Sequence, residues 1–155
     1  MGTAVDSKLA ALLINASPDA VIFATADGNI RVWNPAAEAM FGHSAEQAIG
    51  QNLDIIIPEQ FRAAHWKGFE LALQAGTTKY GGKALATRSM KANGDVFYVE
   101  LSFAIVHDES GAVIGALAHA RDINERFEAD RASRRRLREL EAELKTIREG
   151  GETPA

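Results

Sequence analysis

The residue whose type and placement most suggest chemistry is His65, in a stretch that begins at Pro58 and ends at Gly76. We expect this stretch to be one helix, because proline suits the first helical position and glycine suits the residue after the last turn. Phe61, His65 and Phe69 recur at the spacing of one helical face, so an imidazole shares an apolar stripe with phenyl rings. Such a histidine is either a core residue hydrogen-bonded to a backbone carbonyl or a neutral imidazole that ligates a metal such as haem iron.

The composition excludes several classes of protein. The chain has 155 residues, of which 46% are hydrophobic, and its net charge of -4 does not suggest a nucleic-acid partner. It has no cysteine, which excludes disulfides, a thiolate nucleophile, iron–sulfur ligation and a covalent cysteine–chromophore bond. No apolar run approaches the ~20 residues of a membrane helix, and the start lacks a signal-peptide pattern, so we expect a cytoplasmic protein. Without a Ser/His/Asp spacing, a glycine-rich phosphate loop or paired carboxylates, we do not expect an enzyme.

Local signals predict the elements before the long helix. Residues 19–25 and 29–34 are rich in β-branched and aromatic side chains and flank an Asp-Gly turn, which predicts a hairpin. Simple alternation places Ile30 and Val32 on one face of the second strand and Trp33 on the other. Asn34 as a cap, Ser44 and Gln47 as a capping box, and glycine or proline stops then predict short helices or turns at 35–42, 44–50 and 52–57.

After the long helix the pattern changes to extended segments. Residues 79–91 can run extended, residues 96–106 alternate apolar and polar side chains, and residues 112–121 are small and apolar. The Asn93-Gly94 pair predicts a tight turn between the first two segments. We therefore predict an α+β fold, with an antiparallel sheet of about five strands and with the short helices and the long helix over one face.

Both ends of the chain predict helices that need a partner surface. Asp6 can cap a short amphipathic helix through residue 14, whose leucines must cover the domain or a second copy. Near the other end, apolar residues step by three, four and three, as in the seam of a parallel coiled-coil dimer; they are Leu137, Leu140, Leu144 and Ile147. Asp130 and Ser133 interrupt the same register upstream, so a solvated helix that frays is the alternative.

Several motifs resemble the PAS family of sensor domains over residues 9–126. They are NPAAE at 34–38, IGQN at 49–52 followed by IIPE at 56–59, and RDINER at 121–126. The resemblance implies a PAS fold, with the short helices and one long helix packed on the sheet. It also implies a sensory signal-transduction role in place of catalysis.

The resemblance also implies how the chain is organised. We expect the chain to divide into an N-terminal amphipathic cap helix at 1–17, a PAS domain at 18–122, an exit helix and coiled coil at 123–149, and a disordered tail at 150–155. The expected partners are a second copy, bound through the N-terminal helix and the coiled coil, and a covalent output domain of kinase or cyclase type in the full-length protein. Neither a nucleic acid nor a membrane is expected as a partner.

Residues 57–65, IPEQFRAAH, are most similar to the haem-binding PAS subgroup of the FixL and direct-oxygen-sensor type. That similarity places His65 on the proximal iron ligand of haem b and Lys79 near a haem propionate. Leu85 occupies the position of the arginine that donates to oxygen, and Lys83 that of a methionine ligand. Without a charged donor, O₂ is poorly stabilised, whereas CO or NO depends less on one. The apolar residues expected around the group are Phe61, Phe69, Leu101 and Phe103.

Other interpretations remain open. The domain could hold no cofactor and act as a dimerisation and signal-relay module, with aromatic residues filling its interior. A small carboxylate could pair with Lys79 or Lys83, and a non-covalent flavin could stack on Trp33 or Trp66. Among the other histidines, we expect His43 and His107 at the surface and His119 hydrogen-bonded in the last strand.

Overall fold

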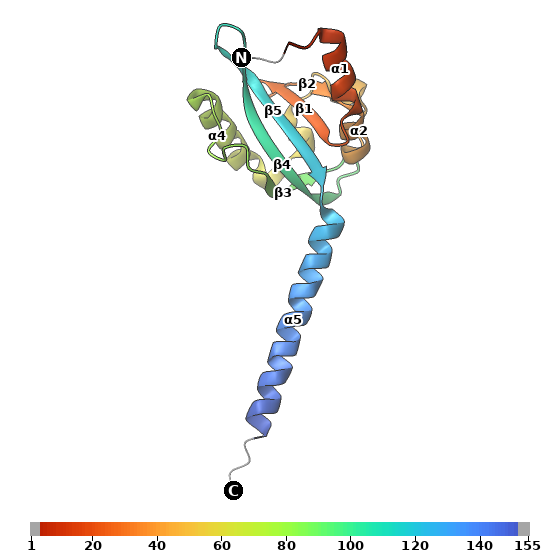
Figure 1. Ribbon diagram of the computed structural model, residues 1–155, viewed down its shortest axis with the longest axis vertical. Coiled ribbons are helices and arrows are strands. Elements are labelled where there is room, and N and C mark those ends of the chain that lie inside the picture. Colours follow the sequence, from red (N-terminus) through yellow and green to blue (C-terminus); the bar gives the residue numbers. More distant parts are fainter. Residues whose placement is uncertain (1–3, 152–155) are drawn as a thin grey trace. The chain divides into compact units, whose positions relative to one another are not determined.

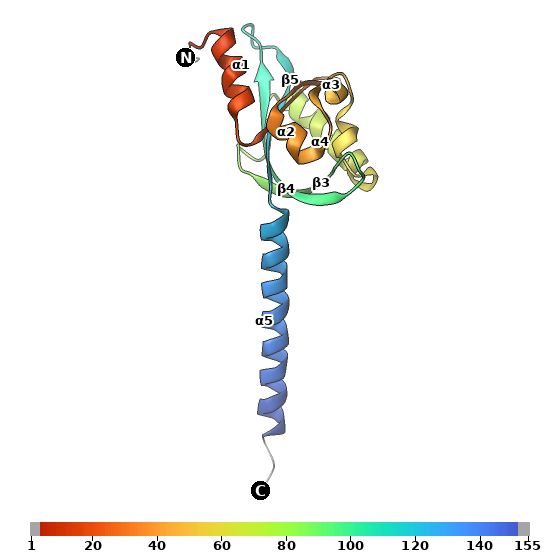
Figure 2. The same cartoon turned by 90° about the vertical axis from the view of Figure 1, so that its right-hand side faces the viewer.

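The structure, a computed structural model, describes residues 4–151, and the expected tail at 150–155 falls largely outside that range. The chain forms two compact units, one ending at Asp122 and the other beginning at Ile123. Most elements of the first unit are labelled in Figure 1, and α3 is labelled in Figure 2. In chain order they are α1 Ser7–Ala16, β1 Ala20–Thr25, β2 Ile30–Trp33, α2 Pro35–Phe41, α3 Ala45–Ala48, the 3₁₀ turn η1 Leu53–Ile56, α4 Glu59–Ala75, β3 Leu85–Met90, β4 Val96–His107 and β5 Val113–Asp122.

The first unit is built on one five-stranded antiparallel sheet, in the order β2-β1-β5-β4-β3. Helices α2, α3 and α4 lie on the same side of this sheet (Figure 2). On β4 the buried Phe97 and Val99 alternate with the less buried Tyr98 and Glu100, as expected for a sheet with one covered face. The predicted α+β fold with an antiparallel sheet and helices over one face is therefore confirmed.

The core lies between the β1/β2 half of the sheet and the short helices. Trp33 packs on Phe41 with ring centroids 5.4 Å apart, and Phe41 meets Phe97 edge-on at 5.6 Å. Ile30 and Phe41 are fully shielded from solvent, so they lie at the centre of the hydrophobic core. Burial of such side chains contributes roughly 1.5–3 kcal/mol each to folding.

Caps predicted from the sequence set the bounds of the short helices. Ser44 and Gln47 form the predicted capping box at α3, and Asn52 caps η1 by accepting from the Asp54 backbone N–H. Asn34 caps α2, with its side chain accepting from the Ala37 backbone N–H. Because these signals act within a few residues, the sequence predicted them well.

Two sequence predictions about the strands were wrong. In β2 both Ile30 and Trp33 are buried, because a bulge shifts the register between Phe23 and Ala24 of β1 and leaves Arg31 without a direct partner. Simple alternation ignores such a bulge. Residues 79–82 form turns, residues 83 and 84 belong to no regular element, and β3 begins only at Leu85.

The second unit is the helix α5, Asn124–Gly150. The predicted exit helix is thus confirmed as a helix. None of its residues is buried in this chain, and the apolar side chains at the predicted coiled-coil positions are exposed. They are Leu137, Leu140, Leu144 and Ile147.

Candidate functional site

Helix α4 carries the predicted stripe of Phe61, His65 and Phe69, and all three side chains are half-buried. The imidazole of His65 stacks on Phe69, with centroids 5.9 Å apart, and meets Trp66 edge-on at 4.8 Å. Its Nδ1 atom is shielded from solvent and has no hydrogen-bond partner. A core histidine would be expected to donate to a backbone carbonyl, but no carbonyl pairs with this nitrogen. A buried polar atom without a partner is costly, so it marks a position where a ligand or ion can bind.

The sheet surface that faces α4 is apolar and incompletely covered. Leu101 and Phe103 on β4 follow the same alternation as the buried Val99, yet both are only half-buried. Leu85 on β3 pairs directly with Leu101 and is also half-buried. No residue of α4 is fully buried. This half of the domain thus presents apolar side chains that its own chain does not fully shield.

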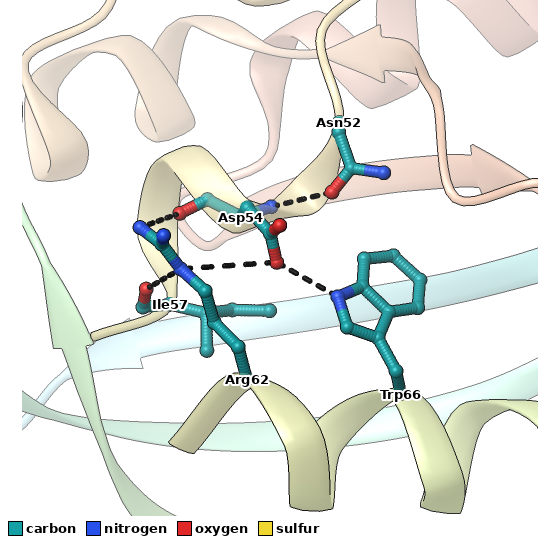
Figure 3. A network of polar contacts seen from close by, with 5 residues as sticks. All are labelled: Asn52, Asp54, Ile57, Arg62 and Trp66. Atoms are coloured by element: carbon teal, nitrogen blue, oxygen red, sulfur yellow. Dashed lines mark hydrogen bonds and ion pairs between the residues drawn. The ribbon is translucent and has the colours of Figure 1, made fainter. Parts of the chain in front are cut away.

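A polar network ties the first half of α4 to η1 (Figure 3). Asp54 accepts a 2.7 Å hydrogen bond from the indole Nε1–H of Trp66 and lies 3.9 Å from the Nε of Arg62. Arg62 also donates to the backbone carbonyls of Ile57, at 3.0 Å, and of Asp54, at 3.2 Å. These contacts fix the start of α4 and the orientation of Trp66, the direct neighbour of His65 in sequence.

The ring of Trp66 also contacts the β1–β2 turn. A Cβ atom placed on Gly28, where φ is +84°, would lie 2.3 Å from Cη2 of Trp66. Only glycine therefore allows the turn to approach the indole so closely. No local sequence pattern predicts this contact or the Asp54–Trp66 bond, because the partners are separated by 38 and 12 residues in the chain.

The protonation of His65 follows from this environment. Burial lowers the pKa of the imidazole below its ordinary value of 6.5, while the nearby Asp54 carboxylate acts in the opposite direction and is the weaker effect. The ring is therefore neutral at pH 7, which is the form that ligates a metal.

We expect the apo-domain to lose stability as the pH falls below about 6.5, because the unfolded chain then binds a proton that the folded His65 accepts less readily. Urea unfolding at pH 7.5, 6.5 and 5.5 measures this loss. It should be smaller in His65→Gln than in the wild type, whereas the exposed His107 serves as a control through His107→Gln. An equal pH dependence in the wild type and His65→Gln would contradict the assignment.

The remaining predicted site residues lie near the start of β3. Lys79 and Lys83 are exposed in the turns that precede this strand, and Lys79 Nζ lies 5.1 Å from the ring of Tyr80. Leu85 is the first residue of β3. The structure therefore brings Leu85 beside Leu101 through strand pairing, and leaves both lysine side chains in solvent.

The other histidines and the tryptophans have structural positions. Trp33 donates from Nε1 to the backbone carbonyl of His43, and Trp66 donates from Nε1 to Asp54. Neither indole N–H is therefore available to a flavin. His43 is half-buried with its Nε2 shielded and unpartnered, so the expectation that it is solvated was wrong. His107 is exposed, as predicted, and His119 lies in the last strand, β5, as predicted, with its side chain exposed.

Two kinds of feature are absent from residues 4–151. No group of three or more His, Cys, Asp or Glu side chains in this part of the chain comes together as a metal cluster would require. In the same range, no helix combines the length and the apolar character needed to span a bilayer.

Comparison with known proteins identifies the family. The chain matches the PAS fold family over residues 9–123. It is 29% identical over 132 residues to the sensor protein FixL of Bradyrhizobium diazoefficiens, aligning 85% of this chain with 25% of FixL. It is 26% identical over 103 residues to the oxygen sensor protein DosP of Escherichia coli, aligning 66% of this chain with 12% of DosP. This chain therefore spans a quarter or less of the length of these two relatives.

Solved structures agree with the family match. The crystal structure of a PAS domain from Colwellia psychrerythraea superposes with a TM-score of 0.67 at 24% identity, covering 76% of this chain and 97% of that one. At this identity the likeness concerns the fold alone. Because the family match covers most of the chain and the observed sheet and helices agree with it, this protein belongs to the PAS family.

Proposed function

We propose that this chain is the sensory module of a signal-transduction protein, and that it binds haem b through His65 to sense a gas or a redox change. The observation that carries the proposal is the buried, unpartnered Nδ1 of a neutral imidazole on the helix that faces an apolar sheet surface. DosP, a relative that aligns with 66% of this chain, is named as an oxygen sensor. Bound haem would supply an iron that takes diatomic gases or changes its oxidation state.

The residues present fit such a group. His65 would ligate the haem iron, with its ring orientation supported by the stacked Phe69 and by Trp66. Phe61, Leu101 and Phe103 would supply apolar contacts, because all three are half-buried and so keep surface available. The exposed ammonium groups of Lys79 and Lys83 suit the propionates, which carry negative charge and remain in solvent.

At the proposed haem site, the resemblance to the FixL type places an apolar residue where that type carries a hydrogen-bond donor. Leu85 is half-buried beside Leu101 and offers no donor. We therefore favour CO, NO or the redox state as the stimulus over O₂, since O₂ depends more strongly on a polar partner. Replacement of Leu85 by arginine is the variant that adds such a donor at this position.

The proposal also includes a route to an output domain. Strand β5 ends at Asp122 and α5 begins at Asn124, so a change in the sheet passes directly along the chain into the helix. The apolar side chains of α1 and α5 are exposed, which suits pairing with a second copy; they include Leu12 and Leu13 of α1 and Leu137 of α5. Because the matched relatives are four or more times longer than the aligned region, an output domain of kinase or cyclase type is proposed beyond this chain.

Titration of the apo-protein with hemin tests the proposal. The wild type should take up one equivalent and show a sharp Soret band, whereas His65→Ala should bind roughly a hundredfold more weakly, the loss expected for about 3 kcal/mol. His119→Ala is the matched control, because its ring is exposed and it lies in β5. Equal uptake with the same spectrum in the wild type and His65→Ala would overturn the proposal.

A second candidate function is a cofactor-free dimerisation and relay module. The observation that favours it is the exposed apolar surface of α1 and α5, which calls for a partner whether or not haem is bound. In that case the wild type would remain colourless with excess hemin while still forming dimers. The two candidates are therefore separated by the same titration combined with a measurement of molecular mass.

A further inference from the structure

Every charged side chain between Glu70 and Asp95 is positive, although the chain as a whole has a net charge of -4. The four cations of this stretch are Lys79, Lys83, Arg88 and Lys91. All 21 Asp and Glu residues of the chain lie outside it. In the structure the stretch contains the turns before β3, β3 itself and the turn that follows it. Such a local excess of positive charge attracts anionic partners.

No carboxylate within residues 4–151 forms an ion pair with any of these four cations. Two of them lie over the rings of neighbouring aromatic residues instead. The guanidinium of Arg88 lies 5.3 Å from the ring centroid of Phe61 and 6.0 Å from that of Tyr98. The Nζ atom of Lys91 lies 4.8 Å from the ring centroid of Phe97. The rings help to hold the cations in place but carry no net charge, so the positive charge stays available to a partner.

Strand β3 is the outermost strand on its side of the sheet, next to β4 (Figure 2). Among the residues that the structure describes, the backbone of residues 85–90 forms ladder contacts with β4 and with no other segment. In an antiparallel pair, every second residue directs its N–H and C=O away from the partner strand. The exposed residues Ala86, Thr87 and Arg88 therefore lie on an edge that can accept a further strand.

The charges decide what kind of strand can add to this edge. A second copy would bring its own β3 with the same cations, and like charges that face each other across a strand pair are destabilising. A nucleic acid would contact the cations but would leave the backbone groups of β3 without partners. An extended peptide with carboxylate side chains satisfies both, because its backbone pairs with β3 while its side chains reach the cations.

We therefore infer that β3 binds an extended acidic segment of a partner protein, which joins the sheet as an additional strand. We define the basic edge as β3 together with Lys83, Arg88 and Lys91. Lys83 precedes the strand, Arg88 lies within it and Lys91 follows it, so the cations span its whole length. The inference goes beyond the proposed sensory function, and Arg88 and Lys91 take no part in the proposed haem site.

Binding of a labelled peptide to the full chain tests the charge of the basic edge. The probe is a fluorescein-labelled peptide of about ten residues in which glutamate alternates with valine, and fluorescence anisotropy at low ionic strength measures its affinity. We expect the double variant Arg88→Gln, Lys91→Gln to bind at least about tenfold more weakly than the wild type. The matched control, Arg31→Gln with Lys8→Gln, removes two exposed cations, one of them on the opposite edge strand β2, and should bind like the wild type.

Two methylated probes test whether the peptide binds as a strand. One carries an N-methyl group on every valine, and the other carries one on every glutamate. Only alternate residues of an added strand direct their N–H groups toward β3, so one of the two probes should bind at least about tenfold more weakly than the other. Both have the same charge and the same number of methyl groups, so each controls for the other.

A reversal of charge separates loss of the surface from loss of folding. The double variant Arg88→Glu, Lys91→Glu should lose the glutamate probe and gain affinity for a probe in which lysine replaces glutamate. Binding of the lysine probe would show that this variant is folded. Failure to bind it, in a variant whose circular dichroism matches that of the wild type, would count against the basic edge.

The other outcomes bear on the inference as follows. No binding by the wild type, or equal binding by the wild type and Arg88→Gln, Lys91→Gln, would overturn the site. Equal affinity for the two methylated probes would overturn strand addition. A single-stranded oligonucleotide of equal charge that binds more tightly than the glutamate probe, with the same dependence on Arg88 and Lys91, would overturn the assignment to a peptide. None of these measurements uses hemin, so the haem proposal stands or fails separately.

Discussion

Replacement of Asn34 by alanine is expected to destabilise the domain by about 4 kcal/mol, because one buried side chain satisfies four backbone groups. Its Oδ1 accepts from the backbone N–H of Val21, at 2.8 Å, and of Ala37, at 3.0 Å. Its Nδ2 donates to the carbonyls of Ile14 and Asp19, both at 3.0 Å. Asn34 thus joins the end of α1, the start of β1 and the start of α2, and it is only 1% exposed. Alanine would leave the buried N–H groups of Val21 and Ala37 without this acceptor, and it would remove one of the donors to the carbonyls of Ile14 and Asp19.

Urea unfolding followed by circular dichroism measures this effect. Asn52→Ala is the matched control: Asn52 also caps a helical turn, but it makes one such bond, to the Asp54 backbone N–H at 2.9 Å, and is half-buried. We expect it to cost about 1 kcal/mol, the usual value of a single cap. If Asn34→Ala lowers the free energy of unfolding by no more than Asn52→Ala does, the claim that the Asn34 side chain holds three elements together is wrong. Asn34→Asp keeps the two acceptor contacts but loses both donors, so it should also be strongly destabilising.

Replacement of Gly115 by alanine is expected to have an effect of similar or larger size, about 4 kcal/mol or more. Gly115 lies in β5 opposite Thr25 of β1. A Cβ atom at this position would lie 2.1 Å from the backbone oxygen of Ala24 and 2.8 Å from Cζ of Phe23. The oxygen belongs to the backbone of a paired strand, so it cannot turn away, and β1 and β5 would have to separate locally.

Gly111→Ala provides the comparison for this variant. Gly111 has a φ of +86°, and nothing lies within 4 Å of the position of its Cβ, so alanine there meets only the backbone penalty of the left-handed region, about 1 kcal/mol. The difference between the melting temperatures of the two variants measures the cost of the steric overlap at position 115 apart from the cost of replacing a glycine. Similar melting temperatures for Gly115→Ala and Gly111→Ala would show that the sheet accommodates the methyl group.

The elements of this protein could be predicted from local signals, and most of them were. Asp6, Asn34 and Ser44 were identified as helix caps, and in the structure each side chain accepts from the backbone N–H of the residue three positions later. Helix α4 begins and ends next to the predicted Pro58 and Gly76. Such signals depend on neighbours in the chain, so the sequence contains them in full.

The errors came from contacts that no local pattern encodes. Trp33 was placed on the wrong face because the bulge in the β1–β2 ladder depends on how the two strands pair. His43 was expected in solvent, but its ring packs against that of Trp33, with centroids 6.3 Å apart. The indole N–H of Trp33 also donates to the backbone carbonyl of His43. Both errors arise because burial is decided by which segments meet in space.

For the candidate site, the sequence alone determined that an imidazole shares a helix face with two phenyl rings, and that the chain contains no cysteine to compete with it. Only the tertiary structure decided that the Nδ1 of this imidazole is buried without a partner and that the opposing sheet surface is incompletely covered. It also revealed that Asp54 holds Trp66 beside His65. The physical reason is that helical periodicity is a property of neighbouring residues, whereas desolvation and the lack of a hydrogen-bond partner depend on every segment that packs around the ring.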